Sequence, residues 1–160
     1  MAIDYFLKID GIEGESKDAK HKNEIEIESF SWGETNSGGA GRGTGGGAGK
    51  VSMQDLVVMT QTSKASPQLL LACASGQHFK SATLTVRKSG KDQQEFLVYK
   101  FTDVRVSSYQ TGGSTGSDSP QDSTALNFAR IEVEYRPQSA TGKPEPPVKA
   151  GWDLKANKKV

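Results

Sequence analysis

Apolar and polar residues alternate with a period of two along most of the chain, which is the pattern of β-strands with one buried face. The alternation is clearest over residues 125–135, where Ala125, Ile131 and Val133 share one face. The opposite face is apolar only at its start, at Leu126 and Phe128. The pattern predicts a long strand whose first face lies in the core throughout.

A hairpin is predicted in the middle of the chain. Residues 81–88 and 94–106 both alternate, and a short polar turn sequence, 89–92, joins them. Gly90 within this turn can adopt the positive φ that the turn geometry requires.

A strand that begins at Ile25 changes phase before Phe30, which predicts a β-bulge near Ser29. Further strands are expected at residues 3–9, 51–58 and 150–154, which brings the total to about seven.

Only the segment that starts at Ser66 has the features of a helix. Ser66 is a candidate N-cap, Pro67 suits the first helical turn, and Gly76 can end the helix after residue 75. Many closely spaced strands with one covering helix indicate a mainly β fold, a small β-barrel or a β-sandwich with one short flanking α-helix.

Three segments carry neither pattern. Residues 36–50 are nearly all Gly, Ser and Ala, and residues 111–122 are rich in Gly and Ser, so both are too long and too glycine-rich for tight turns. Residues 137–147 hold four of the six prolines and should form an extended connection. With no internal repeat, we expect one domain over residues 1–160.

Composition narrows the possible functions. Hydrophobic residues make up 34% of the chain and 18 residues are glycine, so few apolar side chains are available to form a core. The formal net charge of +1 argues against a dedicated nucleic-acid-binding protein, which needs a basic excess. The basic cluster of Lys155, Lys158 and Lys159 is interpreted as solvated lysines at a frayed end.

The sequence also bears on localisation. The N-terminus has no basic region followed by an apolar one, and nowhere do about 18 apolar residues follow one another, so we expect no cleaved signal peptide and no membrane-spanning segment. Cys73, the single cysteine, cannot form an internal disulfide and is interpreted as a small buried hydrophobe. Synthesis in a reducing cytoplasm is expected.

The glycine-rich segment 41–46 fits the letters of the motif G-x-G-x-x-G, which binds dinucleotides. That motif needs a following helix whose N-terminal amides face the phosphates, whereas a strand pattern begins here at Val51. A P-loop would need Gly in place of Thr44 and Ser or Thr in place of Val51. We therefore expect no nucleotide site.

The sequence supports other metal or catalytic sites equally weakly. His21, His78 and one cysteine give no metal-ligand cluster, and the histidines are interpreted as solvated or locally bonded. Ser75 lies close to His78, but neither a strained turn nor an orienting acid is apparent for a hydrolase. The acids within 24–28 alternate as on the exposed face of a strand, unlike paired glycosidase acids. We expect no catalytic residue, no cofactor and no metal.

A β protein with polar faces and glycine-rich projections suits self-assembly, because exposed sheet edges can join neighbours into a ring. Several short motifs are weak alone but specific in their order and spacing. They are Gly14-Glu15-Ser16-Lys17-Asp18, Phe30-Ser31-Trp32-Gly33, the glycine-rich run into Gly49-Lys50-Val51, Leu71-Ala72-Cys73-Ala74-Ser75-Gly76, Leu84-Thr85-Val86-Arg87-Lys88, Val106-Ser107-Ser108 with Thr111-Gly112-Gly113, Leu126-Asn127-Phe128-Ala129, Tyr135-Arg136-Pro137-Gln138 and Gly151-Trp152. Together, from Met1 to about Leu154, the chain resembles the haemolysin-coregulated protein (Hcp) family.

The resemblance implies a small β-barrel of two sheets with one helix, assembled as a hexameric ring. It further implies that rings stack into the inner tube of a bacterial type VI secretion system and that effector proteins travel in the lumen. The expected partners are other copies of the chain, the VgrG spike, the contractile sheath and the effectors. The protein itself would be made in the cytoplasm and exported through the apparatus.

The resemblance also implies residue roles. The matching segment of the family is an extended arm that reaches across an adjacent ring, so the stacking contact is assigned to Ser37, Gly38, Gly41, Arg42, Gly43, Thr44, Gly45, Gly46, Gly47 and Lys50. Ser31 is assigned to the lumen and the effectors, because its neighbours Phe30 and Trp32 alternate away from it into the core. The alternatives are a monomeric β-barrel cargo adaptor or binding module and, third, an enzyme.

Overall fold

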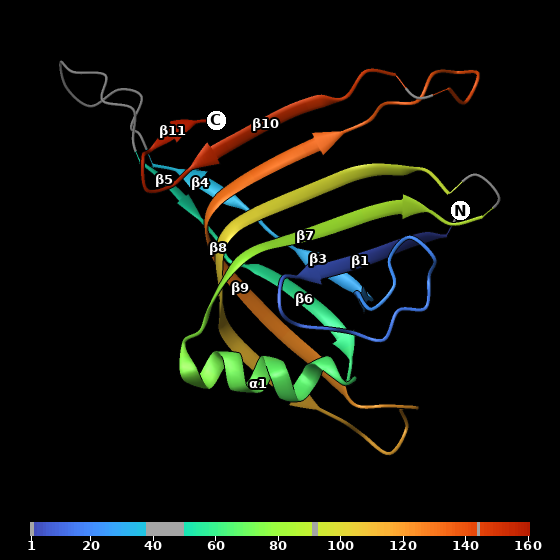
Figure 1. The fold of residues 1–160 in the computed structure, drawn as a ribbon, viewed down its shortest axis with the longest axis vertical. Helices are drawn as coiled ribbons and strands as arrows, with labels where there is room; N and C mark the ends of the chain where they lie inside the picture. The colour runs from blue at the N-terminus through green and yellow to red at the C-terminus, as the bar shows by residue number, and fades with distance from the viewer. Residues whose placement is uncertain (1, 38–49, 91–92, 144) are drawn as a thin grey trace.

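The computed structural model describes residues 2–37, 50–90, 93–143 and 145–160, which form a mainly β fold with one helix (Figure 1). This confirms the predicted fold class. The elements in chain order are β1 (Ile3–Ile9), β2 (Ile25–Ile27), β3 (Ser29–Ser31), β4 (Glu34–Asn36), β5 (Val51–Met53), β6 (Leu56–Gln61), α1 (Ala65–Ser75), β7 (His78–Lys88), β8 (Glu95–Gly112), β9 (Gln121–Tyr135), β10 (Val148–Asp153) and β11 (Lys158–Lys159).

Two sheets are present among the described residues. The large sheet has the order β11-β10-β9-β8-β7-β1-β2, with β6 beside β9 and β3 beside β6, while β4 and β5 form a separate two-stranded ribbon. Each pair of neighbours described in the large sheet runs antiparallel, and short connections suffice where the two strands are consecutive, as with β7 and β8.

The large sheet bends round on itself without closing fully. β2 pairs with β1, and β3, which follows after Glu28 alone, pairs with β6 at the other end of the same sheet. Glu28 still donates its backbone N–H to the Met59 carbonyl at 2.8 Å. The ladder is interrupted at this point, so the fold is barrel-like rather than a closed barrel.

The core lies inside the bend and is covered at one end by α1 (Figure 1). Leu56, Leu84 and Leu126 are fully buried in it, and Leu69 and Ala72 of α1 close its end. A core of this kind loses about 2–5 kcal/mol for each leucine truncated to alanine.

Several predicted elements are confirmed. Gly90 has φ +119° in the turn between β7 and β8, and Gly76 ends α1 with φ +68°, as expected of glycines at positions that disfavour a side chain. The phase change near Ser29 is real, since Glu28 and Ser29 are both exposed, and it falls where the chain passes from one sheet partner to another. The proline-rich segment contains no strand among its described residues.

The predicted burial of the last long strand is wrong in its first half. Leu126 and Phe128 lie in the core, whereas Ala125 and Asn127 on the other face are half-buried. On the opposite face Ile131 is buried, while Val133 is half-buried and Tyr135 is exposed. The change of buried face falls where β9 exchanges one edge partner for another, since it pairs with β6 over residues 121–126 and with β10 over 130–135.

Ser66 is not the N-cap of the helix. The helix begins at Ala65, whose N–H donates to the Ser63 hydroxyl at 3.2 Å, while Lys64 at the cap position makes no side-chain capping bond. Ser66 lies inside the first turn, where its hydroxyl accepts the Ser63 N–H and donates to Asp122. The Ser66 hydroxyl, which the sequence pattern assigns to capping the helix, therefore binds the buried Asp122 carboxylate instead.

The predicted strand 51–58 is two strands, β5 and β6, separated by Gln54 and Asp55. The separation allows β5 to leave the large sheet while β6 stays in it. The predicted loop 111–122 is shorter than expected, because β8 continues to Gly112 and β9 starts at Gln121.

Two smaller expectations are also corrected. Cys73 is half-buried and packs against the core rather than within it. The C-terminal lysines do not lie on a frayed end: Lys155 donates to Asp103 at 2.8 Å, and Lys158 and Lys159 form β11.

Candidate assembly surfaces

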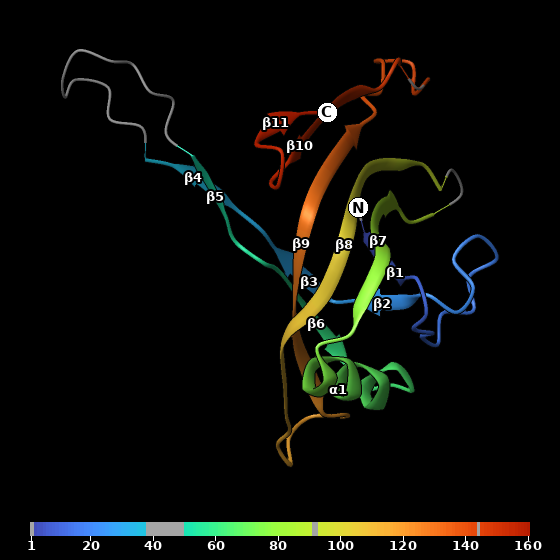
Figure 2. The same ribbon diagram turned by 60° about the vertical axis from the view of Figure 1, so that its left-hand side comes forward.

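The ribbon of β4 and β5 projects away from the large sheet (Figure 2). Its strands pair antiparallel, with Thr35 opposite Ser52, and every residue of β4 is exposed. Ser37 and Lys50, at the two described ends of the predicted stacking loop, are also exposed. Its other members, Gly38, Gly41, Arg42, Gly43, Thr44, Gly45, Gly46 and Gly47, lie outside the described residues.

The ribbon also bears on the glycine motif. The chain that follows Lys50 enters strand β5. A helix N-terminus that could bind phosphate therefore does not follow the glycines.

Ser31 lies on β3 opposite Val57 and is exposed. Its neighbours Phe30 and Trp32 pack against the core, as the alternation predicted. The side chain is therefore accessible on a face of the bent sheet, while its assignment to a lumen stays a prediction.

A groove of about 710 Å³ opens between the ribbon and the end of the large sheet. Trp32 and Met53 line its ribbon side, and Tyr99, Val133 and Trp152 line its sheet side. The indole N–H groups of Trp32 and Trp152 have no hydrogen-bond partner within the described part of the chain. The groove is thus a mainly apolar surface.

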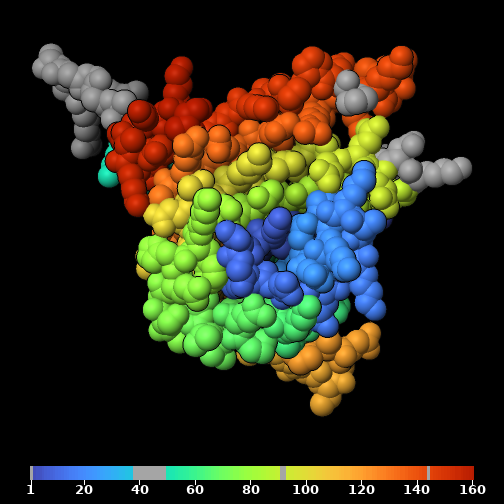
Figure 3. Space-filling model, viewed as in Figure 1, coloured from blue at the N-terminus to red at the C-terminus, as the bar shows by residue number. Residues whose placement is uncertain are grey.

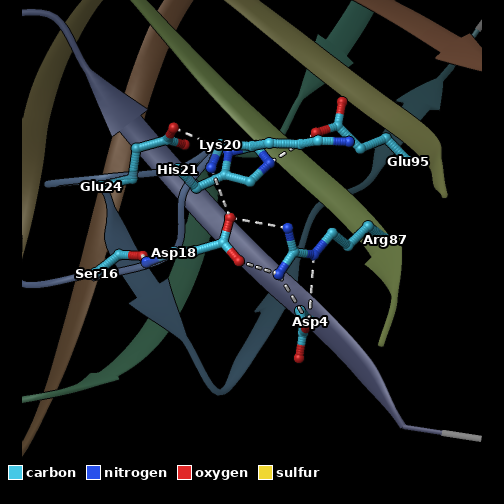
Figure 4. Close-up of polar contacts among 8 residues, drawn as sticks. All are labelled: Asp4, Ser16, Asp18, Lys20, His21, Glu24, Arg87 and Glu95. Carbon is cyan, nitrogen blue, oxygen red and sulfur yellow. Dashed lines mark hydrogen bonds and ion pairs between the residues drawn. The ribbon is translucent and has the colours of Figure 1, made fainter. Parts of the chain in front are cut away.

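The long loop between β1 and β2 is fastened to the sheet by Arg87 (Figure 4). The Arg87 guanidinium donates to both carboxylate oxygens of Asp18, at 2.9 and 2.5 Å, and lies 3.4 Å from an oxygen of Asp4. Its carbon Cζ also lies 4.8 Å from the centre of the Phe6 ring. Only 3% of the Arg87 side chain is exposed, so the ion pair with Asp18 is largely shielded from water.

The hydrogen bonds from Arg87 lower the pKa of Asp18 from 3.8 to about 2, against an opposing contribution from burial. The charge pairing also raises the pKa of Arg87, with the Asp18 hydrogen bond as the largest cause. Asp18 therefore stays ionised in the folded protein well into the acidic range.

His21 joins the same loop to β8 (Figure 4). Its ring stacks on Phe6 with 4.4 Å between ring centres, and its two nitrogens lie 2.9 Å from Glu24 and 2.7 Å from Glu95. The prediction of a locally bonded histidine is confirmed for His21, and also for His78, which contacts Asp103 at 3.0 Å. We name the group of Asp18, His21, Arg87, Glu24 and Glu95 the loop clasp.

Gly14 allows the loop to approach β2 this closely. A Cβ atom at this position would lie 2.5 Å from the Glu24 carbonyl oxygen, which is closer than packed atoms come. The Gly14 N–H itself donates to the Asn23 carbonyl at 2.8 Å. Gly14 and Asp18, both within the motif 14–18, thus hold the loop close to the sheet.

Asp122, like Arg87, has a structural role that the sequence pattern does not indicate, because the pattern predicts a loop over residues 111–122. It is fully buried and accepts hydrogen bonds from the hydroxyls of Ser66 at 2.5 Å, Thr62 at 2.9 Å and Tyr109 at 3.0 Å. Burial raises its pKa, but the hydrogen bonds from Ser66, Thr111, Thr62 and Tyr109 outweigh burial, so the pKa lies below its usual value. Asp122 fixes α1 to β8 and β9.

Across the described ranges, no group of three or more His, Cys, Asp or Glu side chains is placed to hold a metal ion. In the same ranges, no helix has the length and apolarity needed to cross a membrane. Three features of the described chain stand out: the ribbon, the groove and the loop clasp.

Comparison with known proteins gives a consistent result. A family model described as "Type VI secretion system effector, Hcp" matches residues 6–135. Protein hcp1 of Pseudomonas aeruginosa is 51% identical over 159 residues, which cover 98% of each chain.

Solved structures agree. One, described as a type six secretion system protein, is 40% identical with a TM-score of 0.92 and covers 99% of this chain and 100% of its own. Hcp1 from Salmonella typhimurium is 37% identical with a TM-score of 0.81 and full coverage of both chains.

Proposed function

Because the chain belongs to the Hcp family of type VI secretion proteins, we propose that it is the structural subunit of the secretion tube and forms hexameric rings that stack. The family match, which extends over nearly the whole chain, carries the proposal. The geometry adds a projecting ribbon, an apolar groove and the outer edge of β10, where residues 148–150 pair with β9 on one side and with no described strand on the other. Such unpaired and apolar surfaces are normally covered by a partner.

The mechanism is transport by shape rather than by chemistry. Stacked rings enclose effector proteins, and the contractile sheath propels the tube together with the VgrG spike. The protein is made in the cytoplasm and leaves the cell through the same apparatus.

The proposal is tested by size-exclusion chromatography with light scattering, followed by negative-stain microscopy of the peak. Rings with six chain masses are expected. A stable monomer at every concentration would contradict the proposal and favour a monomeric cargo adaptor, whose ligand would then have to be sought.

Deletion of residues 41–47 is expected to spare the isolated ring and to reduce the length of tubes, since we assign this loop to contacts between rings. The measurement is the tube-length distribution by electron microscopy at matched ring concentration. Deletion of residues 115–118, a polar turn between β8 and β9, provides the control. Tubes of normal length after the first deletion would contradict the assignment.

Ser31→Gln is expected to reduce the amount of effector that co-purifies with the rings, because the larger side chain narrows the lumen at an exposed position. The melting temperature and the ring mass should stay unchanged. Ser114→Gln, in an exposed loop, is the matched control. Crosslinking that placed residue 31 on the outer wall of the ring would contradict the assignment.

A further inference from the structure

The two ring nitrogens of His21 both face carboxylates (Figure 4). Nδ1 lies 2.9 Å from an oxygen of Glu24, and Nε2 lies 2.7 Å from an oxygen of Glu95. An ionised carboxylate only accepts hydrogen bonds, and a neutral imidazole carries a hydrogen on one of its two nitrogens. Each contact needs a proton between its two heavy atoms, so the closed loop clasp holds one proton more than a neutral imidazole supplies.

The surroundings of His21 favour this additional positive charge. The imidazole lies nearly parallel to the Phe6 ring, at 8° and 4.4 Å, and the face of an aromatic ring attracts a cation. Only 8% of the His21 side chain is exposed, so water cannot readily replace a hydrogen bond that is lost.

Neighbouring charges act in the same direction. The charged residues on the elements around His21 are Asp4 and Lys8 on β1, Asp18, Lys20, Lys22 and Glu24 on the loop, Glu26 on β2, Arg87 on β7, and Glu95 and Lys100 on β8. The exposed ones, which are the four lysines and Glu26, are screened by water. The less exposed ones are carboxylates with Arg87 as their single permanent cation, so a protonated His21 supplies a second one.

We propose that the loop clasp is a pH-dependent switch: His21 carries a proton on both ring nitrogens while the β1–β2 loop is closed, and the loop detaches from β8 when one proton is lost. Glu95 is 32% exposed and the loop lies at the surface of the molecule (Figure 3), so the proton can pass to water. Because the closed state binds one proton more than the open state, closure is favoured at low pH and weakened as the pH rises. The inference concerns a single chain and does not depend on ring assembly.

The detachment is confined to one part of the loop. Arg87 keeps its charge as the pH rises, because a guanidinium group is not deprotonated in proteins. Its two hydrogen bonds to Asp18 therefore persist. The loop stays fastened at Asp18 and opens over residues 19–24.

Amide hydrogen exchange between pH of about 5.5 and 8.5, where histidines ordinarily titrate, tests the switch. The amides of His21, Asn23 and Glu24 donate hydrogen bonds within the loop at 3.2, 2.8 and 3.2 Å, so their exchange reports its opening. Corrected for the intrinsic pH dependence of exchange, their protection should fall at least about tenfold across this range, since one linked proton changes the opening equilibrium by up to about tenfold per pH unit. Protection in β9 near Leu126, which is fully buried, should stay constant.

Glu95→Gln separates the proton from the contact. A glutamine amide can donate to a nitrogen that lacks a hydrogen or accept from one that carries it, so the bond to Nε2 no longer requires the additional proton. Loop protection in this variant should be nearly constant with pH and should exceed that of the unmodified chain at the upper end of the range. A contact that served packing alone would give equal or lower protection at every pH. If a melting curve shows that this variant unfolds, Glu24→Gln makes the same change at Nδ1.

His78→Gln is the matched control, because His78 is the other of the two histidines and 65% of its side chain is exposed where it contacts Asp103. Its loop protection should depend on pH as in the unmodified chain. Loop protection that does not vary with pH in the unmodified chain, or that varies equally in Glu95→Gln, would overturn the switch. An equal loss of protection in β9 would also overturn it, since the whole domain would then be unfolding rather than the loop opening.

Discussion

Arg87→Met is expected to lower the free energy of unfolding by about 3 kcal/mol, since loss of one partner of a buried ion pair leaves the other charge without compensation. Asp18 would lose both of its short hydrogen bonds to the guanidinium, and the loop between β1 and β2 would lose its main attachment to β7. Methionine retains much of the apolar stem of Arg87 but removes the guanidinium that lies over the Phe6 ring, so the charge and its contact with this ring are lost together. Urea unfolding followed by circular dichroism measures the effect.

Arg136→Met is the matched control. Arg136 also forms an ion pair, with Glu134 at 3.0 Å, but 48% of its side chain is exposed. Exposed pairs contribute about 0–1 kcal/mol, so the control should be nearly neutral. Equal effects of the two substitutions would contradict the role assigned to burial.

The loop clasp also predicts that the stability of the fold depends on pH. The pKa of Asp18 is lowered to about 2 in the folded protein, so between pH of about 5 and 2 the unfolded chain binds a proton at Asp18 that the folded chain does not. The stabilisation from Asp18 is therefore present above its unfolded pKa and lost as the pH falls toward 2. The difference in stability between the unmodified chain and Arg87→Met should shrink over the same window.

Asp122→Ala is expected to be of similar severity, about 3–4 kcal/mol, because it leaves the buried hydroxyls of Ser66, Thr62 and Tyr109 without their acceptor and creates a small cavity. The same unfolding measurement applies. Since these bonds attach α1 to the sheet, the helical signal should be lost at lower urea than in the unmodified chain.

Asp118→Ala provides the control for this substitution, because Asp118 is an exposed aspartate only four residues away in sequence. It should leave the midpoint of unfolding unchanged. Unchanged stability of Asp122→Ala as well would show that the hydroxyls find other partners and that the carboxylate is dispensable.

Local rules account for what sequence reasoning predicted well. The hairpin of β7 and β8, the glycine that ends α1 and the two-residue period of the strands each depend on residues close together in the chain. The ordered motifs then identified the family, which no single local pattern could do.

What sequence reasoning missed depends on contacts between distant segments. Arg87 is a charged residue of a strand, and it is buried where Asp18 of the β1–β2 loop binds its guanidinium. Asp122 follows a run of Gly, Ser and Pro, so its burial could not be recognised before α1 was placed above it. The separation of β5 from β6 likewise reflects different partners, not a break in the local pattern.

The pairing of β9 bears on how the chain folds during synthesis. β6 can pair with β3 as soon as both have left the ribosome, but its other edge must wait for β9, which is made only after α1, β7 and β8. At about 5–20 residues per second this edge stays open for several seconds. An open apolar edge attracts other strands, so the nascent chain is most exposed to aggregation in the interval before Leu126 is synthesised.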